Sequence, residues 1–352
     1  MTQAAEQEAG NATIPVREAH RFDEEALRRY MAAHMDGVGE TLEARQFPGG
    51  QSNPTFLIRT GGRDYVMRKK PPGKLLPSAH QVEREYRVMT ALQNSDVPVP
   101  RTYFLCEDEA VLGTPFFVMD KVPGRVLEDP TLPDFEPAER SAVYDDLLRV
   151  LAALHKVDYE AAGLGELGRH GNYYERQIGR WSKQYVASQT EEIATMDRLM
   201  EWLPRHVPQD ATETLVHGDY RLGNTIVAPG RPRIAAVLDW ELCTFGHPLA
   251  DLAYCYVACF SGLHHEAVPR AGLPSEEEFI GRYCAMTGRD GIPDWTFYKV
   301  FQLFRLAAIV QGVYKRGLDG IASSAKALEY GHVCRERADK AWAMVEEQGL
   351  DR

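Results

Sequence analysis

The spacing of hydrophobic residues changes near residue 120 and divides the chain into two regions. Before that point, one helix is expected from Phe22 to about Met35, with Asp23 as its cap. A second helix is expected over 79–93. Short apolar runs bounded by turn residues predict strands over 41–47, 55–59, 65–69, 102–106 and 115–119. This order predicts a small sheet that carries one main helix, which faces its neighbours with Val82, Tyr86, Met89 and Leu92.

Helical spacing dominates after residue 124, with helices expected over 142–155, 174–188, 191–203, 250–262, 276–287, 293–316 and 324–347. Only segment 214–239 interrupts them, where short strands and the turn cluster 229–232 predict a tight hairpin. We therefore expect an α+β protein with a flexible N-terminus over 1–18. A strand-rich lobe over 19–122 and a helical lobe over 123–352 follow.

Composition and charge limit the kinds of partner. The formal net charge of −11 argues against nucleic-acid binding, which usually needs a basic surface. The six cysteines are scattered without a CxxC pair, which fits buried thiols in a reducing cytoplasm. The first residues lack a signal-peptide pattern, and no run of about 18 apolar residues predicts a membrane span. We expect a cytoplasmic monomer or homodimer without nucleic-acid or membrane partners.

The most informative chemistry lies between His217 and Asp239. Asp219 follows His217 by two residues, Asn224 follows five residues later, and Asp239 ends the next apolar run. Phosphoryl transfer from a nucleotide needs one carboxylate to orient the attacking hydroxyl, and oxygen ligands for magnesium. Asp219 fits the first role, and Asn224 and Asp239 fit the second, in the order found in protein kinases. The alternative is that Asp219 and Asn224 are turn residues and Asp239 caps a helix.

A glycine-rich turn between two predicted strands is a candidate phosphate-binding loop, because such turns can direct backbone N–H groups at an anion. Its candidate cofactor contacts are Gly50, Gln51, Ser52 and Asn53.

On the following strand, Arg68 occupies the position of the kinase cation that pairs with nucleotide phosphates and with a helix glutamate. We favour Glu85 over Glu83 as that partner, because Glu85 flanks the apolar face of its helix. The alternative is that these charges belong to a solvated strand edge and helix surface.

Segment 116–124 ends the last predicted strand of the first lobe. An adenine ring could lie against it and bond its backbone at Asp120 and Val122. A plain linker between the lobes is the simpler interpretation, and both can hold.

Together these residues resemble the aminoglycoside phosphotransferase family of choline-kinase-like enzymes. The likeness rests on segments 217–224, 237–241 and 246–253. Within the family, the chain is similar to the kinase-like domain fused to some acyl-CoA dehydrogenases, through segments 51–55, 65–71, 84–86 and 176–181. The likeness covers roughly residues 20–345.

This resemblance implies a bilobal protein-kinase-like fold, with nucleotide binding in the first lobe and the catalytic loop and acceptor site in the second. It also implies ATP or GTP, Mg²⁺, and a small hydroxylated acceptor such as a hydroxy acid or its CoA thioester. His217 would be a structural hydrogen-bonder, and Asp251 would brace the catalytic loop. The chain departs from many relatives at Arg68, where they have lysine, and at His247, where they have aspartate.

Residues that contact the acceptor are expected mainly in the helical lobe, where aromatic and arginine side chains gather in segment 173–181. Tyr173, Arg176, Arg180 and Glu241 are the candidates. The aromatics of this segment fit the apolar face of a helix equally well. For Glu241, a metal contact through water and a cap of the next segment are further alternatives. Two other functions stay open: an aminoglycoside or amino-alcohol kinase, and a catalytically silent module that binds a nucleotide or CoA.

Overall fold

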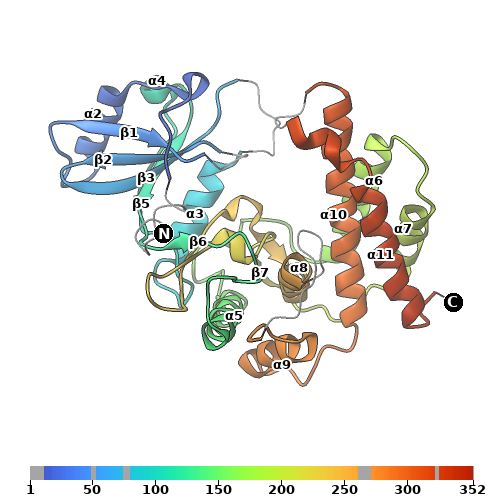
Figure 1. Cartoon of the computed structure of the whole chain (residues 1–352). Coiled ribbons are helices and arrows are strands. Elements are labelled where there is room, and N and C mark those ends of the chain that lie inside the picture. Colours follow the sequence, from blue (N-terminus) through green and yellow to red (C-terminus); the bar gives the residue numbers. More distant parts are fainter. Residues whose placement is uncertain (1–11, 49–52, 74–79, 261–270, 322–324, 352) are drawn as a thin grey trace. The chain divides into compact units, whose positions relative to one another are not determined.

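The computed structural model describes residues 12–48, 53–73, 80–260, 271–321 and 325–351 (Figure 1). The chain forms two compact units: Met1–Leu167 with Leu222–Cys243, and Gly168–Arg221 with Thr244–Arg352. The boundaries of these units differ from the lobe boundary expected near residue 122, which stays a prediction. The chain passes from the second unit to the first between Arg221 and Leu222, inside the segment that carries Asp219 and Asn224.

The first unit contains an antiparallel five-stranded sheet, which confirms the small sheet and the α+β class predicted from the sequence. The order β1-β2-β3-β5-β4 joins Leu42–Gln46, Thr55–Thr60, Arg63–Lys69, Phe116–Asp120 and Thr102–Cys106. Alternate residues of β3 face opposite sides of this sheet. Tyr65 and Met67 pack in a core cluster with Leu27 of α2 (Glu24–His34), whereas Arg68 meets Glu85 of α3 (Val82–Leu92).

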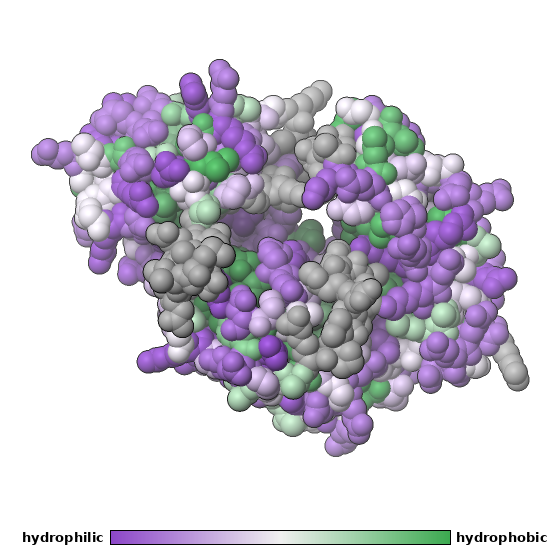
Figure 2. Space-filling view, in the orientation of Figure 1, coloured by the Kyte–Doolittle hydropathy of each residue, from purple (hydrophilic) through white to green (hydrophobic). Residues whose placement is uncertain are grey.

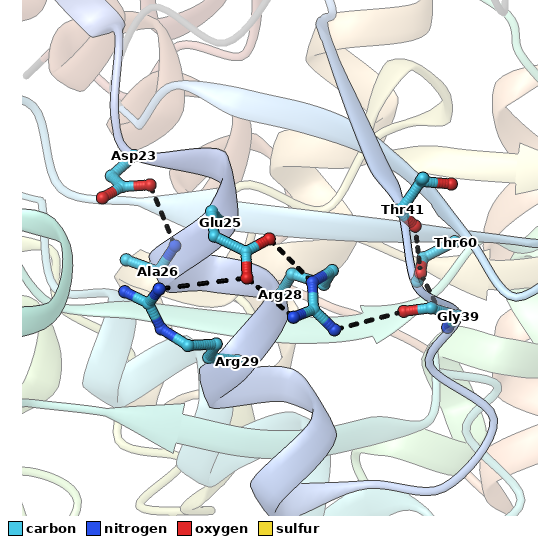
Figure 3. A network of polar contacts seen from close by, with 8 residues as sticks. All are labelled: Asp23, Glu25, Ala26, Arg28, Arg29, Gly39, Thr41 and Thr60. Atoms are coloured by element: carbon cyan, nitrogen blue, oxygen red, sulfur yellow. Dashed lines mark hydrogen bonds and ion pairs between the residues drawn. The ribbon is translucent and has the colours of Figure 1, made fainter.

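Polar contacts fix α2 and the chain that follows it (Figure 3). Asp23 caps the helix by accepting the N–H of Ala26 at 2.9 Å, as its position in the sequence predicts. The hydroxyl of Thr60 accepts the N–H of Gly39 at 3.0 Å and donates to the carbonyl of Thr41 at 2.8 Å. These bonds hold the segment before β1 against the end of β2.

A second, three-stranded sheet in the first unit has the order β6-β8-β9, made of Arg125–Val126, Thr225–Val227 and Ile234–Val237. The helix α5 (Pro137–Leu154) is tied to it, because Asp146 accepts the N–H of Ile234 at 2.7 Å. Short helical turns lie on both sides of the β8–β9 hairpin, η2 (Leu222–Asn224) before it and η3 (Trp240–Leu242) after it. The remaining short elements of this unit are η1 (Glu18–His20) and α4 (Glu109–Leu112).

The second unit is mainly helical and is built around α10 (Trp295–Leu318), which packs against α6, α8 and α11. In Figure 1, α10 and α11 run side by side in orange and red. The other elements are α6 (Tyr173–Ser188), α7 (Ala194–Arg205), β7 (Thr214–Val216), β10 (Thr244–Gly246), α8 (Pro248–Phe260), α9 (Glu276–Thr287), η4 (Ala325–Tyr330) and α11 (Val333–Glu347).

The structure corrects several expectations. The segment 214–239 does not form one hairpin: β8 and β9 pair around the 229–232 turn cluster as expected, whereas β7 pairs with β10. The helix expected over 324–347 is divided into η4 and α11. The helix α5 begins at Pro137, before the expected residue 142, because Glu136 and Glu139 form a capping box. Tyr86 is only half-buried, and the buried positions of α3 include Glu85 and Val88 instead.

The face of the molecule seen in Figure 2 is mainly hydrophilic, with apolar residues confined to small patches. Within the described part of the chain, every helix is too short or too polar to cross a membrane.

The β2–β3 turn provides a matched pair of glycines for a stability test. Both have left-handed backbones, with φ of +58° at Gly61 and +74° at Gly62. A Cβ on Gly61 would lie 1.9 Å from the carbonyl oxygen of Gly37, whereas one on Gly62 has no atom within 4 Å. We expect Gly62→Ala to lower the free energy of unfolding by about 1 kcal/mol, and Gly61→Ala by about 3 kcal/mol or more, through the added clash. Urea unfolding measures both, and equal losses would contradict this account.

Candidate functional site

In the first unit, Arg68 is the centre of a cluster of ionic groups. Its Nε lies 3.0 Å from Oε2 of Glu85, and its Nη2 donates to Oδ1 of Asp239 at 3.1 Å. The Glu85 side chain is fully buried and that of Arg68 is 11% exposed, so water screens this pair little. The structure therefore brings together the strand cation, the helix glutamate and the second aspartate that the sequence singled out. Glu83 instead pairs with Lys70.

The cluster contains more negative than positive groups. Burial alone would lower the pKa of Arg68, but the carboxyl groups of Glu85, Asp239 and Glu241 raise it above its ordinary value. Burial raises the pKa of Glu85 to about 8; Arg68 opposes this rise, and Asp239 and Glu241 add to it. Three carboxyl groups thus share one guanidinium, so the cluster carries an excess of negative charge. A further cation would relieve it.

Asp239 has a strained backbone at the end of the β8–β9 hairpin. Its φ is +66°, a left-handed conformation that residues other than glycine rarely adopt. It stands before the short helix η3, but its side chain makes no capping bond to that helix and meets Arg68 instead. The helix-cap alternative therefore does not describe this side chain. Strained residues of this kind cluster at functional sites, where the surroundings hold them in place.

Asn224 and Asp239 lie at the same end of the β8–β9 hairpin. Thr225 pairs with Val237, and the N–H of Leu238 donates to the carbonyl of Asn224 at 2.9 Å. Asn224 is buried, and the Asp239 side chain is 32% exposed. The hairpin thus places the two expected metal ligands near each other.

The oxygen atoms around this hairpin suit a magnesium ion, which prefers carboxylate and carbonyl ligands. Asn53 is fully buried, and its Nδ2 donates to Oε2 of Glu241 at 3.4 Å. Its Oδ1 is buried and has no hydrogen-bond partner, so one oxygen acceptor beside Glu241 is unused. Together with the shortage of positive charge, these donors fit Mg²⁺. Three residues of the candidate phosphate loop, Gly50, Gln51 and Ser52, lie outside the described residues.

The expected adenine contacts lie where β5 ends. The N–H of Asp120 already donates to the carbonyl of Arg101 at 2.8 Å, so this N–H is not open to a purine. The Asp120 carboxylate accepts the hydroxyl of Tyr103 at 2.6 Å. Val122 is half-buried, and its contact with a nucleotide stays a prediction.

In the second unit, Asp251 holds the backbone that leads to Asp219. Its two carboxylate oxygens accept the N–H groups of His217 at 2.6 Å and of Gly218 at 2.9 Å. The ring of His217 accepts the N–H of Asp219 at 3.2 Å through Nδ1, which fits the hydrogen-bonding role expected of this histidine. Asp251 is 1% exposed, so these charge-assisted bonds form away from water.

Two residues that the sequence argument missed complete this support. Arg305 of α10 is buried and donates to the carbonyl of Gly218 at 2.7 Å, and its guanidinium lies over the ring of Tyr254 at 5.2 Å. The Tyr254 hydroxyl hydrogen-bonds the Asp219 carboxylate; burial and this negative charge raise the pKa of Tyr254 well above its usual range. A lone arginine within the apolar run of α10 was the available signal, as was a tyrosine one helical turn after Asp251.

The helix α6 supplies three of the four candidate acceptor contacts. Tyr173 lies against Gly246, where a Cβ would come within 2.7 Å of its ring, and burial raises its pKa to about 12. Arg176 donates to backbone carbonyls before the helix, and the Arg180 guanidinium lies 5.0 Å from the ring of Trp181. The apolar-face alternative describes Tyr174, Ile178 and Trp181, which are all buried. The fourth candidate, Glu241, lies beside Asn53 in the first unit.

Comparison with known proteins agrees with this chemistry. The model of the phosphotransferase enzyme family matches residues 43–301. The acyl-CoA dehydrogenase family member 10 of Mus musculus is 45% identical over 350 residues, which are 96% of this chain and 32% of that protein. The chain thus spans about a third of this relative, and its share of the other acyl-CoA dehydrogenase relatives also stays below half.

Two solved structures show the same fold. A candidate aminoglycoside phosphotransferase of Ralstonia eutropha is 48% identical, with a TM-score of 0.83, over 93% of this chain and 99% of that one. An aminoglycoside phosphotransferase in a ternary complex with ADP and hygromycin B is 17% identical, with a TM-score of 0.60, over 91% of this chain and 98% of that one. The expectation of a kinase-like fold is confirmed.

Asp251 gives a stability test of the loop support. We expect Asp251→Asn to lower the free energy of unfolding by about 3 kcal/mol, because the amide turns one donor toward a buried backbone N–H that has lost its acceptor. The control is Asp158→Asn, at an exposed carboxylate that also accepts a backbone N–H, from Ala161; it should cost about 1 kcal/mol or less. Urea unfolding compares the two, and equal effects would show that Asp251 does not support the loop.

Proposed function

This chain belongs to the phosphotransferase enzyme family, a family of small-molecule phosphotransferases with hydroxyl acceptors, and we propose that it transfers the γ-phosphate of ATP or GTP to a hydroxy acid or its CoA thioester. The observation that supports the nucleotide as phosphate donor is the pairing of Arg68 with Glu85 and Asp239. This pairing aims a buried guanidinium at the group expected to hold the metal. Guanidinium groups bind phosphate oxygens as a fork, so arginine can serve where relatives use lysine.

In this mechanism the acceptor oxygen attacks the γ-phosphorus, and the bond from that phosphorus to the bridging oxygen of the nucleotide breaks. The hydroxyl proton passes to the carboxylate of Asp219. Asn224 and Asp239 would hold Mg²⁺, which when bound supplies charge neutralisation for the phosphates. Arg68 supplies a fixed positive charge for the same oxygens. Catalysis is then mainly positioning and charge stabilisation, as in other phosphoryl transfers.

The charges of the second unit favour a negatively charged acceptor. Arg221 Nε lies 4.0 Å from the Asp219 carboxylate, and Arg305 lies over Tyr254, which bonds Asp219. The charges of Arg305, Arg176 and Arg180 also act on Tyr173. Such a set attracts a carboxylate or a phosphate-bearing thioester and repels a polycationic aminoglycoside. The name of one relative, an acyl-CoA dehydrogenase family member, also supports an acyl acceptor.

Two alternatives are weaker. An aminoglycoside or amino-alcohol kinase would need acidic acceptor contacts, and in the described part of the second unit the candidate contacts are arginines and a tyrosine. A silent nucleotide- or CoA-binding module would not need Asp219, yet Asp251, Arg305 and Tyr254 all serve to fix its loop and its carboxylate.

A pair of aspartate variants separates proton acceptance from metal binding. We expect Asp219→Asn to lower kcat about 100- to 10,000-fold, because the amide cannot accept the hydroxyl proton. It should keep the rise in melting temperature that Mg²⁺ with AMP-PNP gives the wild type. Asp239→Asn should lose that rise as well as turnover. Near-normal turnover of Asp219→Asn, with Asp158→Asn as the control, would refute the assignment.

The acceptor class can be tested directly. We expect ADP release, measured by a coupled assay with Mg-ATP, to be stimulated by hydroxy acids or their CoA esters and not by aminoglycosides, amino alcohols or sugars. We expect this selectivity because the arginines near Asp219 attract anionic acceptors and repel cationic ones. Stimulation by aminoglycosides alone would overturn the acceptor proposal, and no stimulation by any compound would favour the binding module.

A further inference from the structure

A large open cavity lies within the first unit, at the end of its sheet where β3 begins and β5 ends. Its volume is about 1120 Å³, enough for a metabolite or a coenzyme-sized group. Its wall comes from the start of β3, from β4, from the segment after β5 and from the β8–β9 turn. Tyr65 is on this wall and belongs to the core cluster on the α2 side of the sheet, opposite the face that carries Arg68. Arg68, Glu85, Asp239 and Glu241 do not line the cavity, which is therefore distinct from the Arg68 cluster.

The wall has arginines that are not neutralised by carboxylates. Among the described residues, Arg63, Arg101, Arg125 and Arg231 line the cavity and form no ion pair. The guanidinium of Arg101 lies over the ring of Tyr103 at 5.3 Å, and that of Arg125 over the ring of a phenylalanine at 5.2 Å, so both are held by aromatic faces.

The acidic side chains of the wall are mostly engaged elsewhere. Asp64 pairs with Lys121 at 2.8 Å and with Arg59 at 3.4 Å. Asp120 accepts the hydroxyl of Tyr103, and Glu139 accepts the N–H that opens α5. Asp120 and Glu139 keep their negative charge, as does Asp134. With Asp64 balanced by Lys121, the wall has four arginines against three carboxylates, a small excess of positive charge in a chain whose formal net charge is −11.

A buried hydroxyl on the same wall lacks a partner. Tyr65 is 1% exposed, and its hydroxyl has no hydrogen-bond partner. A buried donor without an acceptor costs free energy and calls for an explanation, such as a ligand that completes it. Its ring meets that of Tyr103 edge to face at 5.5 Å, which fixes the side chain in place.

We propose that this cavity binds a phosphate-bearing small molecule at a site separate from that of the transferred phosphate. Guanidinium groups give the planar donor pairs that phosphate oxygens accept, and the Tyr65 hydroxyl supplies one further donor. Asp120 and Val122, the expected adenine contacts, also line this cavity, so the test includes competition with a nucleotide. The proposed anion contacts are the arginines and Tyr65, none of which is assigned to the phosphotransferase reaction.

Inorganic pyrophosphate is the probe, titrated by calorimetry into the protein alone without Mg²⁺, and into the protein saturated with AMP-PNP and an equal concentration of Mg²⁺. The chains compared are the wild type, the double variant Arg101→Ala/Arg231→Ala, and the control Arg233→Ala. Arg233 is exposed and in the same turn as Arg231, but does not line the cavity. We expect saturable binding to the wild type and the control that persists with AMP-PNP, and binding to the double variant that is weaker by about tenfold or more.

Three results would overturn the proposal: no saturable binding to the wild type, binding that AMP-PNP abolishes, or an equal loss in the Arg233→Ala control. The second result would place the anion in the nucleotide site, and the third would show attraction by general surface charge. Because Asp219 does not line the cavity, a failure of the proposed reaction leaves this measurement interpretable.

Tyr65→Phe provides a second test that does not depend on the double variant's folding. We expect it to leave the melting temperature of the ligand-free protein unchanged or raised, because it removes an unpaired buried hydroxyl. It should weaken pyrophosphate binding several-fold. A lower melting temperature with unchanged binding would show that the hydroxyl supports the fold instead.

Discussion

The first unit depends on how one guanidinium is shared. Arg68 is buried between the helix α3 and the β8–β9 hairpin, and its charge offsets part of the negative charge of Glu85 and Asp239. A buried charge of this kind is tolerated only when it is paired, so the strand, the helix and the hairpin are held in one arrangement. The strained backbone of Asp239 fits this constraint, because the surrounding contacts hold the aspartate in a left-handed conformation.

The second unit solves a different problem, which is to hold a loop that has no regular structure. Gly218 is fixed through both of its polar backbone groups: its N–H by Asp251 and its carbonyl by Arg305. The Asp219 side chain is then oriented by the Tyr254 hydroxyl. Because these partners come from α8 and α10, the position of Asp219 is set by packed helices, and little reorganisation is left for the moment of reaction.

Much of this arrangement could be predicted from sequence. Period-two and period-3.6 patterns located the sheet of the first unit and most helices, and the helix-face argument selected Glu85 as the partner of Arg68. The pairing of β7 with β10 could not be predicted, because three-residue strands carry almost no pattern and their partners are far apart in sequence. Tyr254 and Arg305 were missed because a polar residue on an apolar helix does not reveal its partner. The catalytic and metal-binding roles stay predictions that rest on chemistry and resemblance.

The candidate residues carry an excess of negative charge in the first unit and of positive charge in the second, and the proposed pair of substrates fits both. Around Arg68 the carboxyl groups are in excess, because Glu85, Asp239 and Glu241 all act on one guanidinium. A nucleotide that comes with Mg²⁺ would bring a further cation, whereas a bare polyphosphate brings only further negative charge. Around Asp219 and Tyr173 the arginines are in excess, and an anionic acceptor offsets them. The proposed combination of a metal-bound nucleotide and an anionic acceptor would offset both excesses of charge, although the overall charge of −11 alone would favour a cationic acceptor.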